Sequence, residues 1–269
     1  MKYKKIDTKL FIKNRKNFVN KLERKSIAFF NSNDIYPISA DSTLPFDQHR
    51  DIFYLSGIDQ EESLLVLFPD SVNLEYKEML FLRETNEYIT HWEGEKLTKE
   101  LAKDISGISN IFWLSEFDNI LKKVLTQVDF VYVNTNEHYR QNVQTQTRED
   151  RFINRLKKIG GLKFKKSNPI LQQQRSIKDE IEIELIKNAC EITKKGFERV
   201  LNFIRPGVWE YEIEAEFSHE FLRNRSRRFA YTPIIASGRN SNFLHYVYNN
   251  KQCLDGEIVL MDVAAEYAN

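Results

Sequence analysis

The chain has 269 residues, of which 41% are hydrophobic and 29% charged, and these proportions suit a globular protein with one large domain or two ordinary ones. Its formal net charge of +1 provides no general attraction to nucleic acid or to an anionic membrane, so we expect neither as a partner. No apolar run reaches the ~20 residues that a membrane-spanning helix needs. The two cysteines, Cys190 and Cys253, have no paired spacing, and the basic N-terminal segment lacks the apolar stretch of a secretory signal. We therefore expect a cytoplasmic protein.

Strand and helix patterns alternate through the first part of the chain, which we expect to form a domain over residues 1–174. Short runs rich in β-branched and aromatic residues predict strands at residues 26–30, 52–55, 64–68, 78–83, 110–114 and 130–134. Amphipathic spacing predicts helices at residues 10–22, 96–104, 116–125 and 147–158. This alternation is typical of an α/β fold in which helices cover a mixed or parallel sheet.

The pattern changes to long helices in the second part, which we expect to form a domain over residues 175–269. The Gly-Gly pair at residues 160–161 and the Ser-Asn-Pro run at residues 167–169 indicate a break, which a polar run of three glutamines follows. Ser176 and Asp179 have the spacing of a capping box, and a long helical stripe of apolar residues follows them. A Pro-Gly pair ends this helix, and a second helix is predicted for residues 211–224.

The last segment, residues 229–269, has the most informative pattern. It predicts a strand, a loop that contains His245, and then a buried strand of apolar residues, 258–261, that leads directly into Asp262. A carboxylate at the end of a buried strand is costly unless it is paired or binds a metal ion. The segment therefore predicts the beginning of a metal site.

Several other kinds of site have no support in the sequence. There is no Gly-rich phosphate loop that ends in Lys-Ser/Thr, no GxGxxG after a strand, no HExxH and no GxSxG. Four arginines at residues 223–228 follow a predicted helix, where cations complement the helix dipole, so they are a weak indication of nucleic-acid binding.

Six segments resemble one family, the metallopeptidases of the pita-bread fold, which includes aminopeptidase P, prolidase, creatinase and methionine aminopeptidase. Four of them lie in the second part and read KDEIEIELIKNACEIT, RPGVWEYEIEAEFSHEF, YTPIIASGRNSNFLHY and DGEIVLMDVAAEY. Two lie in the first part and read SADSTLPFDQHRDIFYLSGIDQEESLLVLFP and HWEG. Their order is similar to that in aminopeptidase P. The resemblance implies an N-terminal mixed-sheet α/β domain of the creatinase/aminopeptidase P type and an incomplete, C-terminally truncated pita-bread α+β domain, with an exposed sheet edge.

The resemblance also implies roles for residues of the second domain. Asp262 matches the first ligand of a site for two divalent metal ions, most often Mn2+, and the remaining ligands would lie beyond Asn269. His245 matches a catalytic histidine that donates a hydrogen bond to the substrate carbonyl or oxyanion. Tyr231 and Leu244 match residues that line the substrate pocket. Taken without the resemblance, His245 could be an ordinary loop histidine held by backbone carbonyls, and Leu244 could belong to the core.

Two residues of the first domain match positions that lie against a neighbouring subunit. Trp92 in the HWEG segment matches an aromatic residue that reaches the neighbour's active site, and Asp41 in the SADS segment matches a polar, substrate-binding residue at the same edge. This match implies a homo-oligomer, a dimer or a tetramer, that binds substrate across subunits. The alternative for Trp92 is burial in its own domain. One departure from the family pattern follows Asp262, where Ala264 and Ala265 replace a usual glycine; a positive φ there would strain alanine.

The function that these features imply is metal-dependent hydrolysis by an Xaa-Pro aminopeptidase. Such an enzyme releases the N-terminal residue that precedes proline in a peptide, through a hydroxide that bridges two metals. Two alternatives stay open: a prolidase-like dipeptidase or creatinase-like hydrolase, and a metal-free pita-bread module that binds peptides or proteins. Because only one of five metal ligands is present, we expect this chain to be inactive alone.

Overall fold

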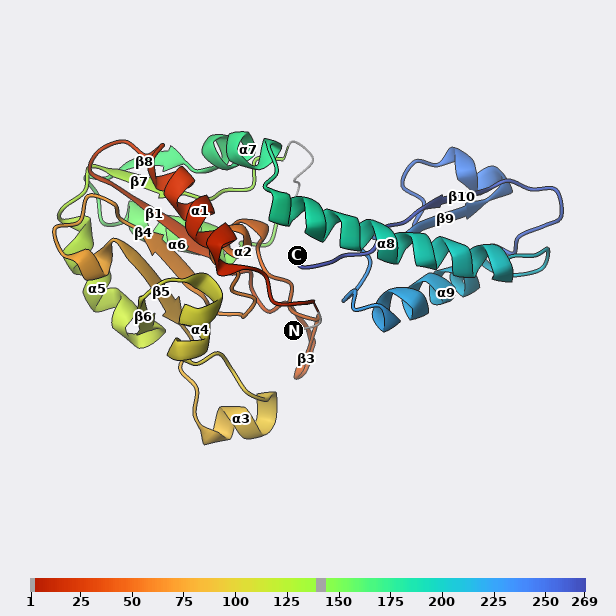
Figure 1. Cartoon of the computed structure of the whole chain (residues 1–269), viewed down its shortest axis with the longest axis horizontal. Coiled ribbons are helices and arrows are strands. Elements are labelled where there is room, and N and C mark those ends of the chain that lie inside the picture. Colours follow the sequence, from red (N-terminus) through yellow and green to blue (C-terminus); the bar gives the residue numbers. More distant parts are fainter. Residues whose placement is uncertain (1–2, 139–143) are drawn as a thin grey trace. The chain divides into compact units, whose positions relative to one another are not determined.

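The computed structural model describes residues 3–138 and 144–269, and the chain divides into two compact units (Figure 1). One unit consists of residues 6–177, and the other of residues 178–269 together with the N-terminal residues 3–5. Among the described residues, no helix is both long and apolar enough to cross a membrane.

A mixed six-stranded sheet organises the unit of residues 6–177. Its strand order is β6-β5-β4-β1-β7-β8. The parallel pairs are β1–β7, β7–β8 and β5–β6, and β1–β4 and β4–β5 are antiparallel. The strands are β1 (Ser26–Asn31), β4 (Leu64–Leu67), β5 (Glu78–Leu82), β6 (Asn110–Trp113), β7 (Phe130–Val133) and β8 (Lys163–Lys166). The predicted mixed-sheet α/β domain is confirmed.

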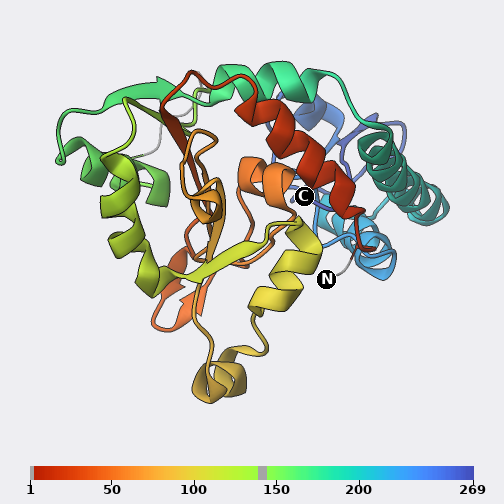
Figure 2. The ribbon, with the colours of Figure 1, turned by 60° about the vertical axis from the view of Figure 1, so that its left-hand side comes forward.

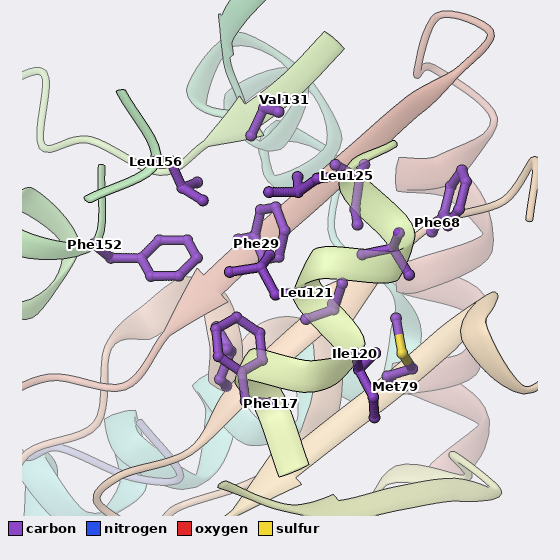
Figure 3. Close-up of a cluster of buried hydrophobic side chains, with 14 of the residues drawn as sticks. Phe29, Phe68, Met79, Phe117, Ile120, Leu121, Leu125, Val131, Phe152 and Leu156 are labelled. Atoms are coloured by element: carbon purple, nitrogen blue, oxygen red, sulfur yellow. The ribbon is translucent and has the colours of Figure 1, made fainter. Parts of the chain in front are cut away.

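Helices cover both faces of this sheet (Figures 1 and 2). On β1, Phe29 packs with residues of α5 (Phe117–Leu125) and α6 (Arg148–Lys157) in one apolar cluster, which Figure 3 shows. Its neighbour Phe30 packs in a second cluster with residues of α1 (Thr8–Val19), α2 (Arg50–Ser56), α4 (Lys99–Ser106) and α7 (Asn168–Ser176). Side chains of a strand alternate between its faces, so a strand covered on both faces is buried at every residue, as β1 is.

Smaller elements extend from this unit. A hairpin of β2 (Pro37–Ser39) and β3 (Ser42–Thr43) is exposed, and helix α3 (Glu87–Glu93) has no buried residue. Single turns of 3-10 helix are η1 (Leu74–Tyr76) and η2 (Leu114–Glu116).

One sequence prediction for this unit is wrong, and helix α7 was not predicted. Residues 52–55 form most of α2 rather than a strand: His49 accepts the Asp51 N–H at the helix start, and Gly57 ends the helix with a φ of 70°. A four-residue apolar run fits either element, and here the caps decide. Helix α7 begins at Asn168, within the predicted break, and its proline lies in the first helical turn, where the missing N–H costs nothing.

Two helices and two strands form the unit of residues 178–269. Helix α8 (Glu180–Phe203) packs on α9 (Glu210–Arg223), and β9 (Ile234–Ser237) pairs with β10 (Val259–Asp262) in an antiparallel sheet. Buried residues of α8, α9, β9 and the loops share one apolar cluster, and partly buried residues of β10 pack against it. This arrangement is part of the predicted α+β pita-bread domain.

Two details of this unit correct the sequence predictions. The capping box of α8 joins Asp179 to Glu182, so Ser176 does not take part in it. Strand β10 is not fully buried: Val259 and Met261 lie against the cluster, whereas Leu260 is 40% exposed and Ile258 75% exposed. A two-stranded antiparallel sheet packs one face on its helices and leaves the other face to solvent, which produces this alternation.

Candidate active site

Asp262 and Tyr231 lie together at one end of the β9–β10 pair. The strand register places Asp262 opposite Ile234, three residues after Tyr231. The Tyr231 hydroxyl donates a hydrogen bond to Oδ1 of Asp262 at 2.5 Å. Burial of the phenol, this hydrogen bond and the negative charge of Asp262 raise the pKa of Tyr231 to about 12, so the hydroxyl keeps its proton at neutral pH. The structure thus joins the residue expected to bind metal to one expected to bind substrate.

His245 and Leu244 lie in the loop between the 3-10 helix η3 (Gly238–Asn242) and β10. Leu244 is 91% exposed, so the alternative interpretation of this leucine as a core residue is wrong. His245 is also exposed, and over residues 3–138 and 144–269 it has no hydrogen bond or ion pair. Both side chains are therefore available to a ligand.

Glu210 fixes the base of this loop, and the sequence analysis did not identify it. Its carboxylate is fully buried and accepts hydrogen bonds from the backbone N–H and the hydroxyl of Ser237, at 2.6 and 2.8 Å. The other oxygen accepts from the Tyr246 hydroxyl at 2.7 Å and from the backbone N–H of Lys251 at 2.9 Å. Glu210 therefore connects α9 to β9 and to the residue beside His245.

The pKa of Glu210 reflects two opposing effects. Burial raises it, but the hydrogen bonds from Tyr246, Ser237 and Lys251 favour the charged form and bring the pKa below its usual value. Sequence offers only a weak signal for this role, because a glutamate in the first turn of a helix is common for dipole reasons alone.

Asn249 completes the support of this segment. The side chain is buried, its Oδ1 accepts the Ile235 N–H at 3.0 Å, and its Nδ2 donates to Glu214 at 2.8 Å and to the carbonyl of Pro233 at 3.1 Å. The loop is thus held at both sides of His245 by buried polar contacts, which limit its conformations.

Trp92 and Asp41 belong to the other unit and are described there alone. Trp92 lies on α3 and is 71% exposed, in contact with the rings of Tyr88 and His91, so the alternative interpretation of burial in its own domain is wrong. Asp41 is exposed at the turn of the β2–β3 hairpin. Helix α3 is anchored by Glu93, whose carboxylate accepts two hydrogen bonds from Arg83 at 2.8 Å.

Asp262 suits a hard divalent ion, because such ions prefer carboxylate oxygens. In the part of the chain that the structure describes, however, no three His, Cys, Asp or Glu side chains gather in a way that could hold a metal ion. One carboxylate is not a complete donor set for a metal pair. Neither Ala264 nor Ala265 has a positive φ, so the backbone is not strained at these two alanines.

The two units define a class of protein: an α/β domain with a mixed sheet, followed by a pita-bread type α+β unit with an aspartate at the end of a strand. Residues 11–132 match the sequence family described as the aminopeptidase P N-terminal domain, and residues 184–269 match metallopeptidase family M24. The chain therefore combines a region similar to the aminopeptidase P N-terminal domain with a region similar to metallopeptidase family M24.

Known proteins with the same two domains are similar over nearly the whole chain. The Xaa-Pro aminopeptidase of Escherichia coli K12 is 29% identical over 96% of this chain and 58% of its own length. The solved structure of Pseudomonas aeruginosa aminopeptidase PepP has a TM-score of 0.87 and 26% identity, over 98% of this chain and 60% of its own. A zinc-substituted aminopeptidase P of E. coli in complex with product has a TM-score of 0.83 and 28% identity, with the same coverage. The chain thus spans about three fifths of these proteins.

Proposed function

We propose that this chain contributes to an Xaa-Pro aminopeptidase, which hydrolyses the bond between an N-terminal residue and a following proline. The observation that carries the proposal is the hydrogen bond between Tyr231 and Asp262, beside strands that match the M24 family. An X–Pro bond is a poor substrate for ordinary aminopeptidases, because proline lacks a backbone N–H and restricts its predecessor. A dedicated pocket overcomes both effects.

Each predicted site residue has a role in this proposal. Asp262 would be one ligand of a pair of divalent metal ions, with Mn2+ expected, and the pair would supply the hydroxide for attack on the scissile carbonyl. Tyr231 keeps one oxygen of Asp262 occupied and so orients the other. His245 would donate a hydrogen bond to the substrate carbonyl, and Leu244 would contact the peptide's side chains.

The proposal extends to assembly and location. The exposed aromatic side chains of Tyr88 and Trp92 on α3 support a homo-oligomer, a dimer or a tetramer, in which Trp92 and Asp41 would reach a neighbouring active site. Cys190 and Cys253 are both free thiols, which supports a reducing compartment such as the cytoplasm.

Peptide assays test the function. With Mn2+ present, we expect no turnover by the 269-residue chain alone, because the described residues offer one metal ligand. A longer protein that carries this sequence and further ligands should cleave an X-Pro-Y tripeptide, and Asp262→Ala should abolish this activity. His245→Ala should lower kcat by about 100-fold, as expected for loss of an oxyanion donor. His219→Ala, on the exposed side of α9, is the matched control and should leave kcat unchanged.

The same assays separate the alternatives. A prolidase-like enzyme would cleave the dipeptide X-Pro faster than the tripeptide. A metal-free binding module would take up no Mn2+ in a titration followed by elemental analysis, and would still bind X-Pro peptides. Mn2+-dependent cleavage by the 269-residue chain alone would contradict the expected inactivity.

A further inference from the structure

The loop that carries His245 has few contacts of its own to hold it in place. Among the described residues, no hydrogen bond reaches the backbone of residues 244–248. Of residues 242–248, six are exposed and Tyr246 alone is partly buried. A segment that lacks backbone hydrogen bonds and apolar burial opens easily unless side chains anchor it. The order of the backbone at His245 therefore depends on the side-chain contacts of its neighbours.

Tyr246 is an anchor directly beside His245. Its hydroxyl donates to Oε2 of Glu210 at 2.7 Å, and this fully buried carboxylate lies at the start of α9. The same hydroxyl accepts the backbone N–H of Asn250 at 3.3 Å, which ties the far side of the loop to the same point. Burial and the hydrogen bond to Glu210 raise the pKa of Tyr246, so the hydroxyl keeps the proton that it donates.

The other anchors of the loop lie too far along the chain to replace Tyr246. Before His245, the nearest backbone hydrogen bond runs from the N–H of Phe243 to the carbonyl of Asn240 at 3.0 Å. After His245, the next buried side chain is that of Asn249, whose Oδ1 accepts a backbone N–H of β9. Each residue between these two anchors has two free backbone dihedrals, so without a contact in the middle the backbone could adopt many conformations. Tyr246 supplies the contact in the middle.

These contacts give a role to a side chain that would not itself touch a peptide. We propose that Tyr246 is a positioning residue for His245. By binding Glu210, the hydroxyl of Tyr246 holds the backbone of residue 245 in one conformation, and this fixes where the imidazole meets the carbonyl of a substrate. A fixed donor costs no reorganisation when the substrate reacts, which is the source of its effect on rate. The role of His245 rests on the proposed function, whereas the anchoring by Tyr246 does not.

Backbone order in the 269-residue chain, measured by nitrogen-15 NMR relaxation, tests the anchoring without metal or substrate. The order parameter at residue 245 should be about 0.85 in the unsubstituted chain. It should fall below about 0.6 in Tyr246→Phe, which removes the hydroxyl and keeps the ring. Tyr248→Phe is the matched control, because it makes the same change two residues further on, at a side chain that is 80% exposed. This control should leave the order parameter unchanged.

A second control separates positioning from a general loss of stability. Ser237→Ala removes a different hydroxyl from the same carboxylate, the one that donates to Oε1 of Glu210 at 2.8 Å. Both Ser237→Ala and Tyr246→Phe should lower the thermal midpoint, because Glu210 loses one hydrogen bond in each variant. The order parameter at residue 245 should fall only in Tyr246→Phe, since Ser237 lies in β9 and does not contact the loop beside His245.

Kinetics in a longer protein that carries this sequence and further metal ligands test the consequence for the reaction. Tyr246→Phe should lower kcat for an X-Pro-Y tripeptide by about 10- to 100-fold, as a small displacement of a reacting group can do, and should leave KM nearly unchanged. Adding Tyr246→Phe to His245→Ala should cause no further loss of kcat, because the tyrosine acts through the histidine. Tyr248→Phe should leave both constants unchanged.

Each of these measurements can overturn the inference. It is wrong if the order parameter at residue 245 is below about 0.6 in the unsubstituted chain, does not change in a folded Tyr246→Phe variant, or falls equally in Ser237→Ala. It is also wrong if kcat does not change in Tyr246→Phe, or if the losses from Tyr246→Phe and His245→Ala add.

Two further results keep the inference testable and separate from the proposed function. If Tyr246→Phe fails to fold, the unsubstituted chain decides: the hydroxyl proton of Tyr246 should exchange slowly enough with water to be observed by NMR, and fast exchange contradicts the anchoring. If the longer protein does not cleave an X-Pro-Y peptide, the proposed function fails, and the order parameters still decide whether Tyr246 holds the loop.

Discussion

Glu210 shows how one buried carboxylate can organise a loop that has no regular structure of its own. Its two oxygens accept four short hydrogen bonds from residues up to 41 positions away, including the backbone N–H of Ser237 and Lys251. Hydrogen bonds to a charged carboxylate are strong when the donors are already in position. Replacing Glu210 therefore costs stability, because its donors would lose their acceptor. The position of His245 depends on this carboxylate through its neighbour Tyr246.

Replacing Glu210 with glutamine should therefore destabilise the chain. An amide N–H₂ would face the donors Tyr246 and Lys251, and we expect a loss of about 1–3 kcal/mol in the free energy of unfolding at pH 7, measured by urea titration. The folded pKa of Glu210 lies below its unfolded value, so the carboxylate stabilises the fold above that value and this contribution is lost as pH falls. The difference in unfolding free energy between Glu210→Gln and wild type should therefore shrink as the pH falls below the usual pKa of a glutamate.

Glu198→Gln, which removes an exposed ion pair with Lys194, is the control for this measurement and should change the unfolding free energy by less than about 0.5 kcal/mol. If the difference in unfolding free energy between Glu210→Gln and wild type does not change with pH, the role assigned to Glu210 is contradicted.

The contribution of Glu149 to the unfolding free energy should depend on pH in the opposite direction to that of Glu210. Burial raises its pKa from 4.5 to about 7, against the hydrogen bonds from Asn31 and Asn134. A carboxyl group with a raised folded pKa contributes stability that is complete below the unfolded value and is lost as pH rises through the folded value. Between pH 5 and pH 8 the stability of Glu149→Gln should rise relative to wild type, by on the order of 2 kcal/mol in urea titrations. A constant difference would show that Glu149 titrates normally.

The pair of helices α8 and α9 approaches closely at one glycine. A Cβ at Gly196 would lie 2.6 Å from Cε1 of Phe221 and 2.8 Å from Cδ1 of Phe217. Both rings are almost completely buried and therefore have little room to move. The sequence alone indicates only a glycine within a helical stripe, which ordinarily weakens a helix.

Gly196→Ala should consequently lower the thermal midpoint in spite of alanine's higher helix propensity. The propensity gain is about 1 kcal/mol and the overpacking loss about 1–3 kcal/mol. Adding Phe217→Leu to Gly196→Ala should restore part of the loss, because the smaller side chain makes room for the methyl group. If the double variant loses more stability than the two single variants lose in sum, this packing explanation is contradicted.

The elements that sequence patterns predicted correctly are those whose pattern is long or has a single interpretation. Five of the six strands predicted for the first domain exist, and the stripe that predicted the helix after Asp179 corresponds to 24 helical residues. The sixth, at residues 52–55, is a helix because caps at His49 and Gly57 outweigh a short apolar run. Hydrophobic periodicity carries no information about the geometry of helix caps. It therefore could not show that residues 52–55 form a helix.

The candidate site was harder to predict than the fold. Resemblance indicated Tyr231 and Asp262 separately. These two residues are 31 positions apart, and their hydrogen bond depends on the register of β9 and β10. Register is set by long-range packing, which a single sequence does not display. Glu210 was missed for the same reason, since its partners are distant in the chain and none is an unusual residue.

Each of the two units buries apolar residues of its own, and the buried clusters of the described residues differ in size between the units. The unit of residues 6–177 buries two clusters, one on each face of a six-stranded sheet. The unit of residues 178–269 buries a single cluster of ten residues beside a two-stranded sheet. Ile177, between α7 and α8, is 81% exposed and belongs to neither interior.

We therefore expect two unfolding transitions in urea rather than one. Residues 178–269 should unfold first, because buried apolar area is the main source of stability and two strands alone provide little. Residues 6–177, produced as a separate fragment, should unfold at the urea concentration of the second transition. Fluorescence would assign the transitions, since Trp209 lies in one unit and Trp92 and Trp113 in the other. A single transition with coincident signals from all three tryptophans would mean that the two interiors stabilise each other and form one cooperative unit.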